Sequence, residues 1–418
     1  MARKRENKLG FSTRALHYGY DPKQHNSARV TPIYQTMAYL FDDVEQAARL
    51  CKLEEIGFTY TRINNPTTAI LEERIASLES GDYAVALASG MAAISSALLT
   101  LLRAGDEILS SASLYGGTYS FFSTTLPKFG IKANFVQAAN VAHFEKGITE
   151  KTKLIFAETI GNPRIDIPDL AAIAEVAHKR NIPFFVDNTV ATPYLCRPIE
   201  HGADVVIHSA SKFIGGQGAA LGGLVVASDA FEWVRAFPSL KQYDDMGVSP
   251  FGFAVRNESL RDFGAALSPF HSFLFIQGLE TLSLRMEKHS RNAEAVARFL
   301  KSHSAVEYVN YPLFEDHPSF NNARKYLPKG CGALLSFGVK GGLEAGKRVV
   351  NSMKLISHLA NLGDAKTLIL HPASTTHEHL SAEERIAAGA PDELIRISVG
   401  IEDVEDIISE LERGLENV

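Results

Sequence analysis

Between residues 84 and 208, short apolar runs alternate with stretches of helical periodicity. Six apolar runs have the length and composition of strands, at residues 84–88, 107–110, 132–136, 154–158, 183–186 and 205–208. Helical patterns lie among them at residues 92–102, 118–129 and 169–180. Runs that are apolar on both faces are typical of parallel strands covered by helices on both sides. The sequence therefore predicts an α/β protein with a mostly parallel central sheet.

The 418 residues are too many for one ordinary core, so we expect several parts. Residues 1–65 contain many turn formers and little periodicity, which predicts an extended N-terminal arm that lies on a neighbouring subunit. Residues 66–275 are expected to form the sheet domain. Residues 276–418 are expected to form a smaller C-terminal α/β domain. Residues 231–267 show no clear periodicity, and a segment of this length is often functional.

Within the predicted C-terminal domain, a long helix is expected through the apolar stripe of residues 279–300. Strands are expected at residues 306–309, 333–337 and 394–399, and helices at residues 343–351 and 402–415. A further strand of the sheet domain is expected at residues 223–227.

Composition narrows the class of protein. A content of 45% hydrophobic and 22% charged residues is typical of a soluble globular protein, and the net charge of −6 argues against a nucleic-acid partner. A basic cluster at residues 3–8 precedes no apolar run, so we expect a frayed terminus rather than a signal peptide. The uncharged run 83–102 is broken by Ser89-Gly90, which predicts a strand, a turn and a helix rather than a membrane span. Three scattered cysteines favour a cytoplasmic location.

A lysine follows the last of the alternating strands. Lys212 comes after Ser209-Ala210-Ser211 and before Gly215 and Gly216, where its amine is expected to point into a cleft. A desolvated lysine amine can act as nucleophile and base, and can condense with the aldehyde of pyridoxal 5′-phosphate (PLP). A single lysine is far more often a surface residue, so this hypothesis depends on the surrounding motifs.

Other strand ends supply groups that suit PLP. Ligands bind at the carboxyl ends of parallel strands. Ser89-Gly90-Met91 ends one strand and begins a helix, whose N–H groups suit a phosphate. Tyr115 lies on a glycine-rich turn, Asn162 offers an amide, and Asp187 offers a carboxylate. Each has an ordinary explanation as a turn, a core aromatic or a helix cap, but together with Lys212 they favour a PLP site.

An arginine, Arg396, occupies the middle of an apolar strand. It requires an anion, which is either a substrate carboxylate or a structural acid. The turn that contains Asn361 could help to hold the same carboxylate. His371, His377 and His379 lie in a loop without an arranged acid, so no metal site is predicted.

Taken together, these motifs resemble the Cys/Met-metabolism family of PLP-dependent enzymes, which has the PLP-dependent transferase fold type I. The resemblance covers nearly the whole chain and is carried by Ser89-Gly90-Met91-Ala92, Tyr115-Gly116-Gly117-Thr118, Phe185-Val186-Asp187-Asn188-Thr189, Ser209-Ala210-Ser211-Lys212 and Arg396-Ile397-Ser398-Val399-Gly400. It implies that Lys212 binds PLP covalently, that Asp187 pairs with the pyridinium nitrogen, and that Tyr115 stacks on the ring. Asn162 would lie near the ring hydroxyl.

The resemblance also implies a phosphate site and an oligomer. The phosphate would be held by Ser89, Gly90, Met91, Ser209 and Ser211, with Tyr60 and Arg62 reaching it from an adjacent subunit. Arg396, Asn361 and Tyr60 would bind the substrate. The implied assembly is a homotetramer built from dimers with shared active sites.

Within the family, residues 265–270, 359–366 and 371–377 look like those of O-acetylhomoserine sulfhydrylases. Gly117 stands where methionine γ-lyases often carry Cys, and Ser211 stands where many members have Thr. The implied reaction is a γ-replacement, in which O-acetyl-L-homoserine and sulfide give L-homocysteine and acetate. Lys212, Tyr115 and Asp187 would be catalytic, and sulfide would arrive free or on a sulfur-carrier protein. The alternatives are a cystathionine γ-synthase or methionine γ-lyase activity, or a non-catalytic PLP-binding protein.

Overall fold

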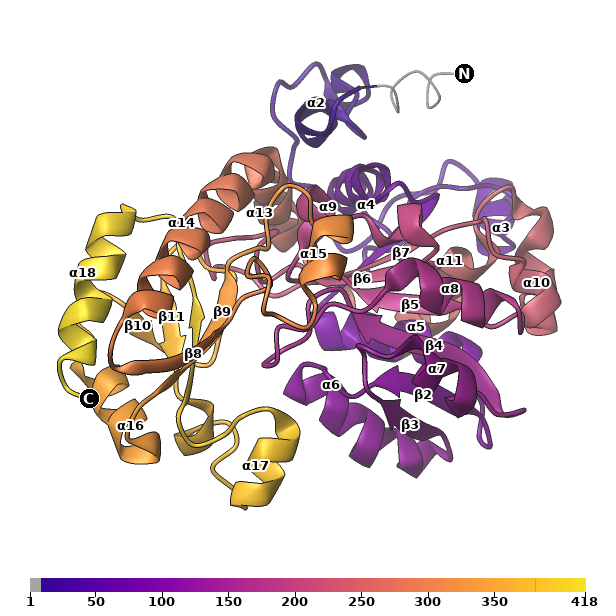
Figure 1. The fold of residues 1–418 in the computed structure, drawn as a ribbon. Coiled ribbons are helices and arrows are strands. Elements are labelled where there is room, and N and C mark those ends of the chain that lie inside the picture. The colour runs from indigo at the N-terminus through magenta and orange to yellow at the C-terminus, as the bar shows by residue number, and fades with distance from the viewer. Residues whose placement is uncertain (1–8, 380) are drawn as a thin grey trace. The chain divides into compact units, whose positions relative to one another are not determined.

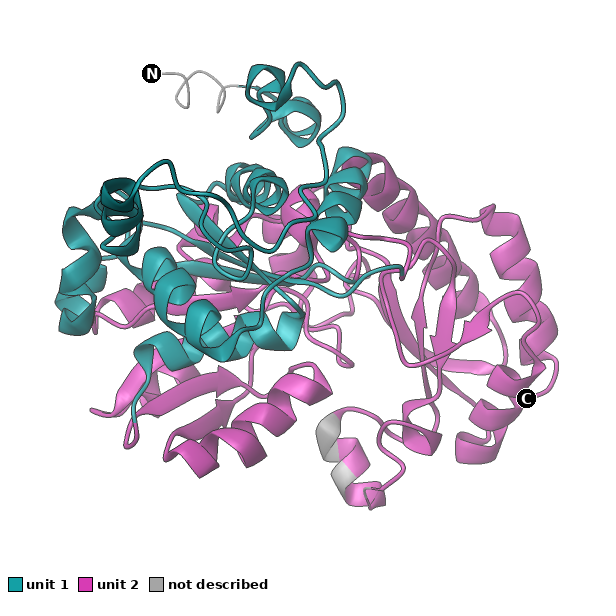
Figure 2. Ribbon diagram, turned by 180° about the vertical axis from the view of Figure 1, so that it is seen from behind, with its two compact units in different colours: residues 1–103, 204–211, 219–281 teal, residues 104–203, 212–218, 282–418 magenta. Residues whose placement is uncertain are grey.

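The computed structural model describes residues 9–379 and 381–418 (Figure 1). The chain forms two compact units that each draw on separated stretches of sequence (Figure 2). The first unit comprises residues 1–103, 204–211 and 219–281, and the second comprises residues 104–203, 212–218 and 282–418. The predicted domain boundaries at residues 65 and 275 stay predictions. The basic cluster at residues 3–8 lies outside the described residues.

The larger sheet has seven strands in the order β1-β7-β6-β5-β4-β2-β3. Their bounds are Tyr83–Leu87 for β1, Glu107–Ser111 for β2, Lys132–Val136 for β3, Thr152–Glu158 for β4, Phe184–Asp187 for β5, Val205–Ser209 for β6 and Gly223–Ala227 for β7. Strand β2 pairs in parallel with β3 and β4, and β4 pairs in parallel with β5. Strand β7 is antiparallel to β1 and β6. The predicted α/β fold with a mostly parallel sheet is confirmed.

In the first unit, polar caps define where the main helices begin. Helix α4 (Pro66–Glu79) begins after Asn65, whose side chain accepts the Thr67 N–H at 3.0 Å. Helix α5 (Gly90–Leu101) begins after Ser89, and α13 (Pro269–Glu280) begins with a proline. Such residues fix the first turn of a helix. The uncharged run 83–102 is thus β1, a turn and α5, and within residues 9–379 and 381–418 no helix is long and apolar enough to cross a membrane.

The segment 231–267, to which the sequence pattern assigned no fold, consists of consecutive short helices. They are α10 (Trp233–Ala236), η5 (Pro238–Met246), α11 (Pro250–Ala254), the π-helix η6 (Val255–Leu260) and α12 (Arg261–Phe263). Pieces of three to nine residues are too short to show a helical period in the sequence. Trp233 stacks on Phe251 with a ring-centroid distance of 4.5 Å, which gives these helices a common aromatic core.

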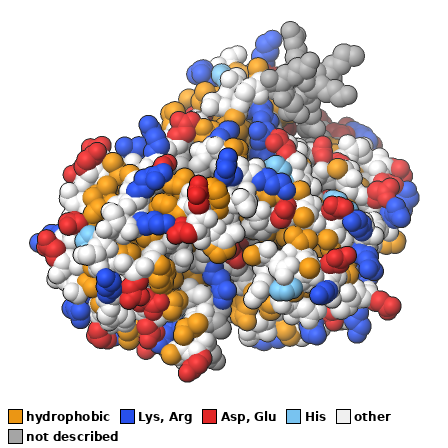
Figure 3. Space-filling view, in the orientation of Figure 1, with side chains coloured by type: hydrophobic (Ala, Val, Ile, Leu, Met, Phe, Trp, Pro, Cys, Tyr) orange, Lys and Arg blue, Asp and Glu red, His pale blue; other side chains and the backbone are white. Residues whose placement is uncertain are grey.

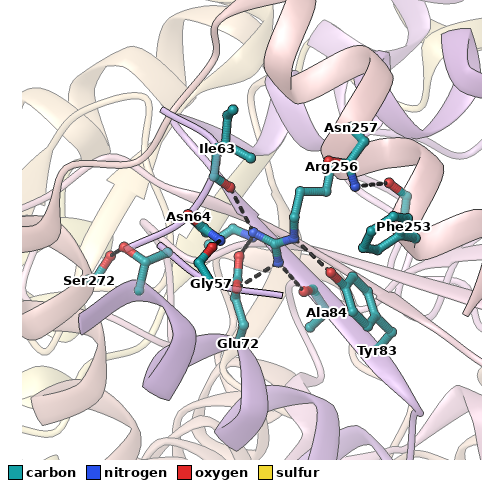
Figure 4. A network of polar contacts seen from close by, with 12 residues as sticks. Gly57, Ile63, Asn64, Glu72, Tyr83, Ala84, Phe253, Arg256, Asn257 and Ser272 are labelled. Atoms are coloured by element: carbon teal, nitrogen blue, oxygen red, sulfur yellow. Dashed lines mark hydrogen bonds and ion pairs between the residues drawn. The ribbon is translucent and has the colours of Figure 1, made fainter. Parts of the chain in front are cut away.

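A buried ion pair joins this segment to the rest of the first unit (Figure 4). The Arg256 guanidinium lies 2.7 Å from a carboxylate oxygen of Glu72 in α4. It also donates to the Tyr83 hydroxyl of β1 at 2.7 Å, and to the carbonyls of Ile63 at 3.0 Å and Ala84 at 3.1 Å. Burial of a charge is tolerated when its partners are this complete. Arg256 therefore links α4, β1, η6 and the end of the N-terminal arm.

The arm contains short helices, α2 (Phe11–His17), η1 (Pro22–His25) and α3 (Val44–Cys51). Large apolar side chains of the arm are exposed, at Val30, Met37, Leu40, Val44 and Ile56. On the face drawn in Figure 3, acidic and basic side chains are mixed. The exposed side chains at Val30, Met37, Leu40, Val44 and Ile56 give the arm an apolar surface that its own chain does not bury.

In the second unit, a five-stranded sheet has the order β10-β11-β12-β9-β8. Its strands are β8 (Val306–Asn310), β9 (Leu334–Val339), β10 (Ser357–His358), β11 (Leu368–Leu370) and β12 (Leu394–Ser398). Three of them match predicted strands, whereas β10 and β11 are too short to give an apolar run. The other elements of this unit are α6 (Gly116–Ser120), the π-helix η2 (Phe121–Thr125), η3 (Leu126–Phe129), α7 (Val141–Gly147), α8 (Leu170–His178), α9 (Thr192–Leu195), η4 (Pro198–His201), α14 (Leu282–Ser302), α15 (Phe320–Tyr326), α16 (Gly342–Ser352), η7 (Pro372–Ser374), α17 (Ala382–Ala388) and α18 (Val404–Leu415).

Phe156 of β4 is fully buried and packs edge-to-face on Phe122 at a centroid distance of 5.2 Å. We expect Phe156→Ala to lower the free energy of unfolding by about 3–5 kcal/mol, because it removes apolar contacts and leaves a cavity. Urea unfolding measures this loss. The control is Phe129→Ala, which removes a ring that is 54% exposed and should change stability little. Equal effects of the two variants would contradict this account of the core.

Candidate active site

Lys212 begins a turn that the Gly216 N–H closes by donating to the Lys212 carbonyl at 2.7 Å. Its amine donates to the side-chain oxygen of Asn361. Burial lowers the pKa of the Lys212 amine, and the nearby Arg396 guanidinium lowers it further. A larger fraction of the amine is therefore neutral, which is the form that attacks an aldehyde or accepts a proton.

Helix α14 holds the backbone that follows Lys212. Arg285 of this helix donates to the carbonyl of Phe213 at 2.5 Å and to that of Ile214 at 3.1 Å. Gly216 has a φ of +72°, and a Cβ there would lie 2.3 Å from a guanidinium nitrogen of Arg285. Only glycine fits this approach. The sequence pattern did not single out Arg285, although an arginine inside the buried stripe of α14 signals a need for acceptors.

Arg396 lies in the middle of β12, and its guanidinium faces amide oxygens. It donates to the Asn361 carbonyl at 3.0 Å and to the Asn162 side-chain oxygen at 3.4 Å. Burial lowers the pKa of Arg396 to about 10. Among the described residues, Arg396 has no ion pair with an acid, so none of them is the structural acid that was the alternative to a substrate carboxylate. Its planar fork suits a carboxylate.

Two acids lie side by side at the ends of parallel strands. Asp187 ends β5, Glu158 ends β4, and the two residues are paired in register. A Glu158 oxygen accepts the Tyr115 N–H at 2.6 Å, and an Asp187 oxygen accepts the Thr189 N–H at 2.9 Å. Burial raises the pKa of the Glu158 carboxyl well above its usual value, and Asp187 raises it further. The sequence analysis missed Glu158, although it is the last residue of a predicted strand.

Tyr115 precedes α6, and its ring folds back over Gly117. A Cβ at residue 117 would lie 2.4 Å from a ring carbon of Tyr115. A larger residue at position 117 would therefore displace the ring. The tyrosine is 53% exposed, so its flat face is available to a ligand.

In the first unit, the N-terminus of α5 lies close to the end of β6. Ser89 caps α5 by accepting the Ala92 N–H at 3.1 Å. A Cβ on Gly90 would lie 2.7 Å from the Ser209 Cβ. The Ser211 hydroxyl accepts the Gly222 N–H at 3.0 Å and thereby fixes the residue before Lys212. The N–H groups at a helix N-terminus and the nearby serine hydroxyls suit a phosphate group.

The predicted site residues thus fall into sets. In the second unit, the contacts described above connect Lys212, Asn361, Arg396 and Asn162, and connect Tyr115 with Glu158 beside Asp187. In the first unit, Ser89, Gly90, Met91, Ser209 and Ser211 lie at the end of β6 and the start of α5. Ser211 and Lys212 are consecutive, so the chain itself joins the sets. Tyr60 and Arg62 lie in the arm, where the Arg62 guanidinium is 5.4 Å from the Tyr60 ring centroid and donates to the Arg261 carbonyl.

Within residues 9–379 and 381–418, no group of three or more His, Cys, Asp or Glu side chains could hold a metal ion. The ring nitrogens of His371 contact the Ser374 hydroxyl and the Asp392 carbonyl, both at 2.8 Å. This histidine therefore has a local structural role.

Comparison with known proteins defines the class. The family described as Cys/Met metabolism PLP-dependent enzyme matches residues 12–416, and the chain belongs to this family. It is 47% identical to the homocysteine synthase of Schizosaccharomyces pombe over 97% of this chain and 98% of that protein. It is 44% identical to the O-acetyl-L-homoserine sulfhydrylase of Leptospira meyeri over 97% of this chain and 96% of that protein.

A solved structure gives the same result for the fold. A crystal structure described as an O-acetylhomoserine (thiol)-lyase of Campylobacter jejuni superimposes with a TM-score of 0.94. It is 40% identical, and the match covers 98% of this chain and 100% of that chain. That crystal structure contains N′-pyridoxyl-lysine-5′-monophosphate, which is PLP joined to a lysine. The predicted family, fold type and PLP cofactor are confirmed.

Because the raised pKa of Glu158 reflects a penalty on its charged form, stability should depend on pH. Below the usual pKa of glutamate, Glu158 is neutral in both states and the penalty is absent. As the pH rises from this usual pKa through the raised folded-state pKa, the free energy of unfolding of the wild type falls. A neutral Gln side chain does not cause this fall. We therefore expect the melting temperature of Glu158→Gln, relative to the wild type, to increase between pH 4 and pH 9. Thermal unfolding across this range measures the difference.

Glu175→Gln is the matched control for this pH series. Glu175 is exposed, and its pKa is lowered by a hydrogen bond and charge attraction from Lys179. Its substitution should show no such increase with pH. A constant difference between Glu158→Gln and the wild type would contradict the burial argument.

Proposed function

We propose that the protein is an O-acetylhomoserine sulfhydrylase, which converts O-acetyl-L-homoserine and sulfide into L-homocysteine and acetate. One observation supports this proposal most directly. The Lys212 amine and the Arg396 guanidinium both contact Asn361, and neither forms an ion pair with an acid among the described residues. This arrangement suits an amino acid, whose carboxylate would bind Arg396 while its reacting carbon lies near Lys212. Relatives that match over nearly the whole chain carry names for this activity.

Each unit contributes residues whose chemistry suits PLP. In the proposed site, Lys212 would bind the aldehyde, Asp187 would accept a hydrogen bond from the protonated ring nitrogen, and Tyr115 would lie against the ring. Asn162 would lie near the ring hydroxyl. The phosphate-binding set is Ser89, Gly90, Met91, Ser209 and Ser211. Bound PLP supplies an electron sink that makes the α-proton of the amino acid removable.

Side chains of the protein carry out the remaining steps. Arg396 and Asn361 hold the substrate carboxylate, and so fix which bond at the α-carbon is broken. The lowered pKa of Lys212 leaves its amine able to take the α-proton. Tyr115 is the proposed partner in further proton transfers, and Tyr60 contacts the substrate from an adjacent subunit. Over the whole reaction, the γ-carbon loses acetate and gains sulfur.

Product analysis tests the proposed reaction. With PLP, O-acetylhomoserine and sulfide, the purified protein should form homocysteine and acetate in equal amounts. Lys212→Ala should lower the rate by about a thousandfold or more, because covalent binding and base are both lost. Lys329→Ala is the matched control, since burial also lowers the pKa of Lys329, and it should keep activity.

Other outcomes would identify the alternatives. Cystathionine formed with cysteine as the acceptor would indicate a cystathionine γ-synthase, and elimination of methionine without an acceptor would indicate a methionine γ-lyase. Bound PLP without turnover would indicate a non-catalytic binding protein. Turnover with free sulfide alone would make a sulfur-carrier protein unnecessary. The proposed location is the cytoplasm, in line with three cysteines that form no disulfide, Cys51, Cys196 and Cys331.

We further propose a homotetramer built from dimers, in which the arm of one subunit completes the active site of another. Two features support an intersubunit role. The arm exposes apolar side chains, including Met37 and Leu40, and it carries the Tyr60 and Arg62 pair. Phosphate binding by an arginine from the arm would neutralise charge that the chain's own α5 N-terminus only partly balances.

Mixing two inactive variants tests the shared site. Arg62→Ala has an intact Lys212, and Lys212→Ala has an intact arm. If the arm acts on the neighbouring subunit, subunit exchange should restore activity to about a quarter of the wild-type level, because half of randomly formed dimers are mixed and each has one complete site. Activity of the mixture that equals the sum of the separate variants would contradict a shared site.

A further inference from the structure

The segment 231–267 has no role described so far, yet it carries Arg256, a buried arginine with four hydrogen-bond partners. Arg256 projects from the π-helix η6 and is 7% exposed. Figure 4 shows its guanidinium directed toward Glu72, Tyr83, Ala84 and Ile63. Glu72 is itself fixed, because its other oxygen accepts the Ala86 N–H of β1 at 2.8 Å.

One of the Arg256 contacts reaches the arm. The guanidinium donates to the carbonyl of Ile63 at 3.0 Å, and Ile63 directly follows Arg62. The side chain of Arg62 rests on the same segment, where it donates to the Arg261 carbonyl at the start of α12. The α-carbon of Gly264 faces this side chain, since a Cβ there would lie 3.8 Å from the Arg62 Cδ. Both the carbonyl of the residue after Arg62 and the Arg62 side chain are therefore supported by residues 256–264.

Residues 57–62 also pair with another part of the arm. The Thr61 N–H donates to the Met37 carbonyl at 2.8 Å, and the Tyr39 N–H donates to the Thr59 carbonyl at 3.1 Å. Such pairing shapes residues 57–62 but does not attach them to the sheet. Two contacts supply that attachment. Asn65, which caps α4, donates to the Thr61 hydroxyl at 3.1 Å, and Arg256, which Glu72 and Tyr83 hold against α4 and β1, donates to the Ile63 carbonyl next to Arg62.

We propose that Arg256 is a positioning residue that orients Tyr60 and Arg62 toward the cofactor phosphate of an adjacent subunit, with residues 231–267 as its support. This inference rests on the shared active site proposed above. It assigns a role to a segment whose sequence shows no recognisable motif. In this role Arg256 acts on the active site of another subunit. A residue needed only for the folding of its own chain would not affect that site.

Arg256→Lys isolates the contact with the arm. The lysine ammonium should stay with the Glu72 carboxylate, because a buried charge pair is the strongest interaction available to it. One ammonium lacks the planar fork that reaches Ile63 and Ala84 at the same time. We expect the Kd of the apoprotein for PLP to rise about tenfold, which is the effect of losing one charge-assisted hydrogen bond. Fluorescence titration with PLP measures this Kd.

Hydrogen exchange gives a readout that does not depend on the cofactor. Amides of residues 57–64 should exchange faster in Arg256→Lys, whereas those of β1 should keep the wild-type rate. Arg235→Lys is the matched control, since Arg235 lies in the same segment but pairs with the exposed Glu232. It should leave both the Kd and the exchange unchanged. A wild-type Kd for Arg256→Lys would overturn the proposal.

Mixing with Lys212→Ala separates action on the neighbouring site from a structural effect. In a mixed dimer, the active site that contains the Lys212 of the Arg256→Lys chain receives its arm from the Lys212→Ala chain, whose Arg256 is intact. That active site should regain the wild-type Kd for PLP. If Arg62→Ala is rescued by this partner and Arg256→Lys is not, Arg256 acts within its own chain and the inference is wrong. If Arg62→Ala is not rescued either, the shared site itself fails.

A second variant covers the case in which Arg256→Lys does not fold. Arg256→Met combined with Glu72→Met removes both members of the buried pair, and such apolar replacements often preserve stability. The double variant also loses the contact with Ile63. It should show the same weakened PLP binding and the same rescue by Lys212→Ala, and tight PLP binding by the folded double variant would overturn the proposal.

Discussion

The candidate active site depends on positive charges that are buried without a carboxylate beside them. Lys212 and Arg396 both have a lowered pKa because burial disfavours their charged forms, and in the described chain their partners are amide and carbonyl oxygens. Partial charges on such oxygens balance a full charge only in part. The site therefore has a net attraction for an anion.

Arg256 shows the opposite use of the same side chain. It is more deeply buried than Lys212 and Arg396, but it faces the Glu72 carboxylate, and attraction by Glu72 outweighs burial and raises its pKa. A completed pair of this kind fixes elements relative to one another and leaves little attraction for a ligand. Arg285 is an intermediate case, because it is buried, its pKa is lowered to about 10, and it organises the backbone after Lys212 through carbonyl groups. The Glu72 carboxylate thus distinguishes Arg256, which has a structural role, from Arg396, the candidate ligand-binding arginine.

The acids of the site are also arranged by the sheet. Glu158 and Asp187 end neighbouring parallel strands, so their carboxyl groups are brought together by register alone. Burial, and then repulsion by Asp187, raise the pKa of the Glu158 carboxyl, so this side chain favours its neutral form. Glu158 meanwhile accepts the Tyr115 N–H, so the same residue that disfavours a second charge also positions the aromatic ring.

The sequence by itself determined the α/β class and most strands, because runs such as β1 and β7 are apolar and bounded by turn residues. It also pointed to Lys212, Asp187 and Arg396, since a charged residue next to or within an apolar strand is a local anomaly that can be recognised without coordinates. Only the tertiary structure decided which oxygens face these charges. Glu158, Arg285 and Arg256 acquire their roles through partners that lie 29 to 193 residues away in the chain, as shown by Asp187 for the first and Ile63 for the last. Contacts between such distant residues leave no periodic trace in the sequence, because they depend on strand register and on how separated segments pack.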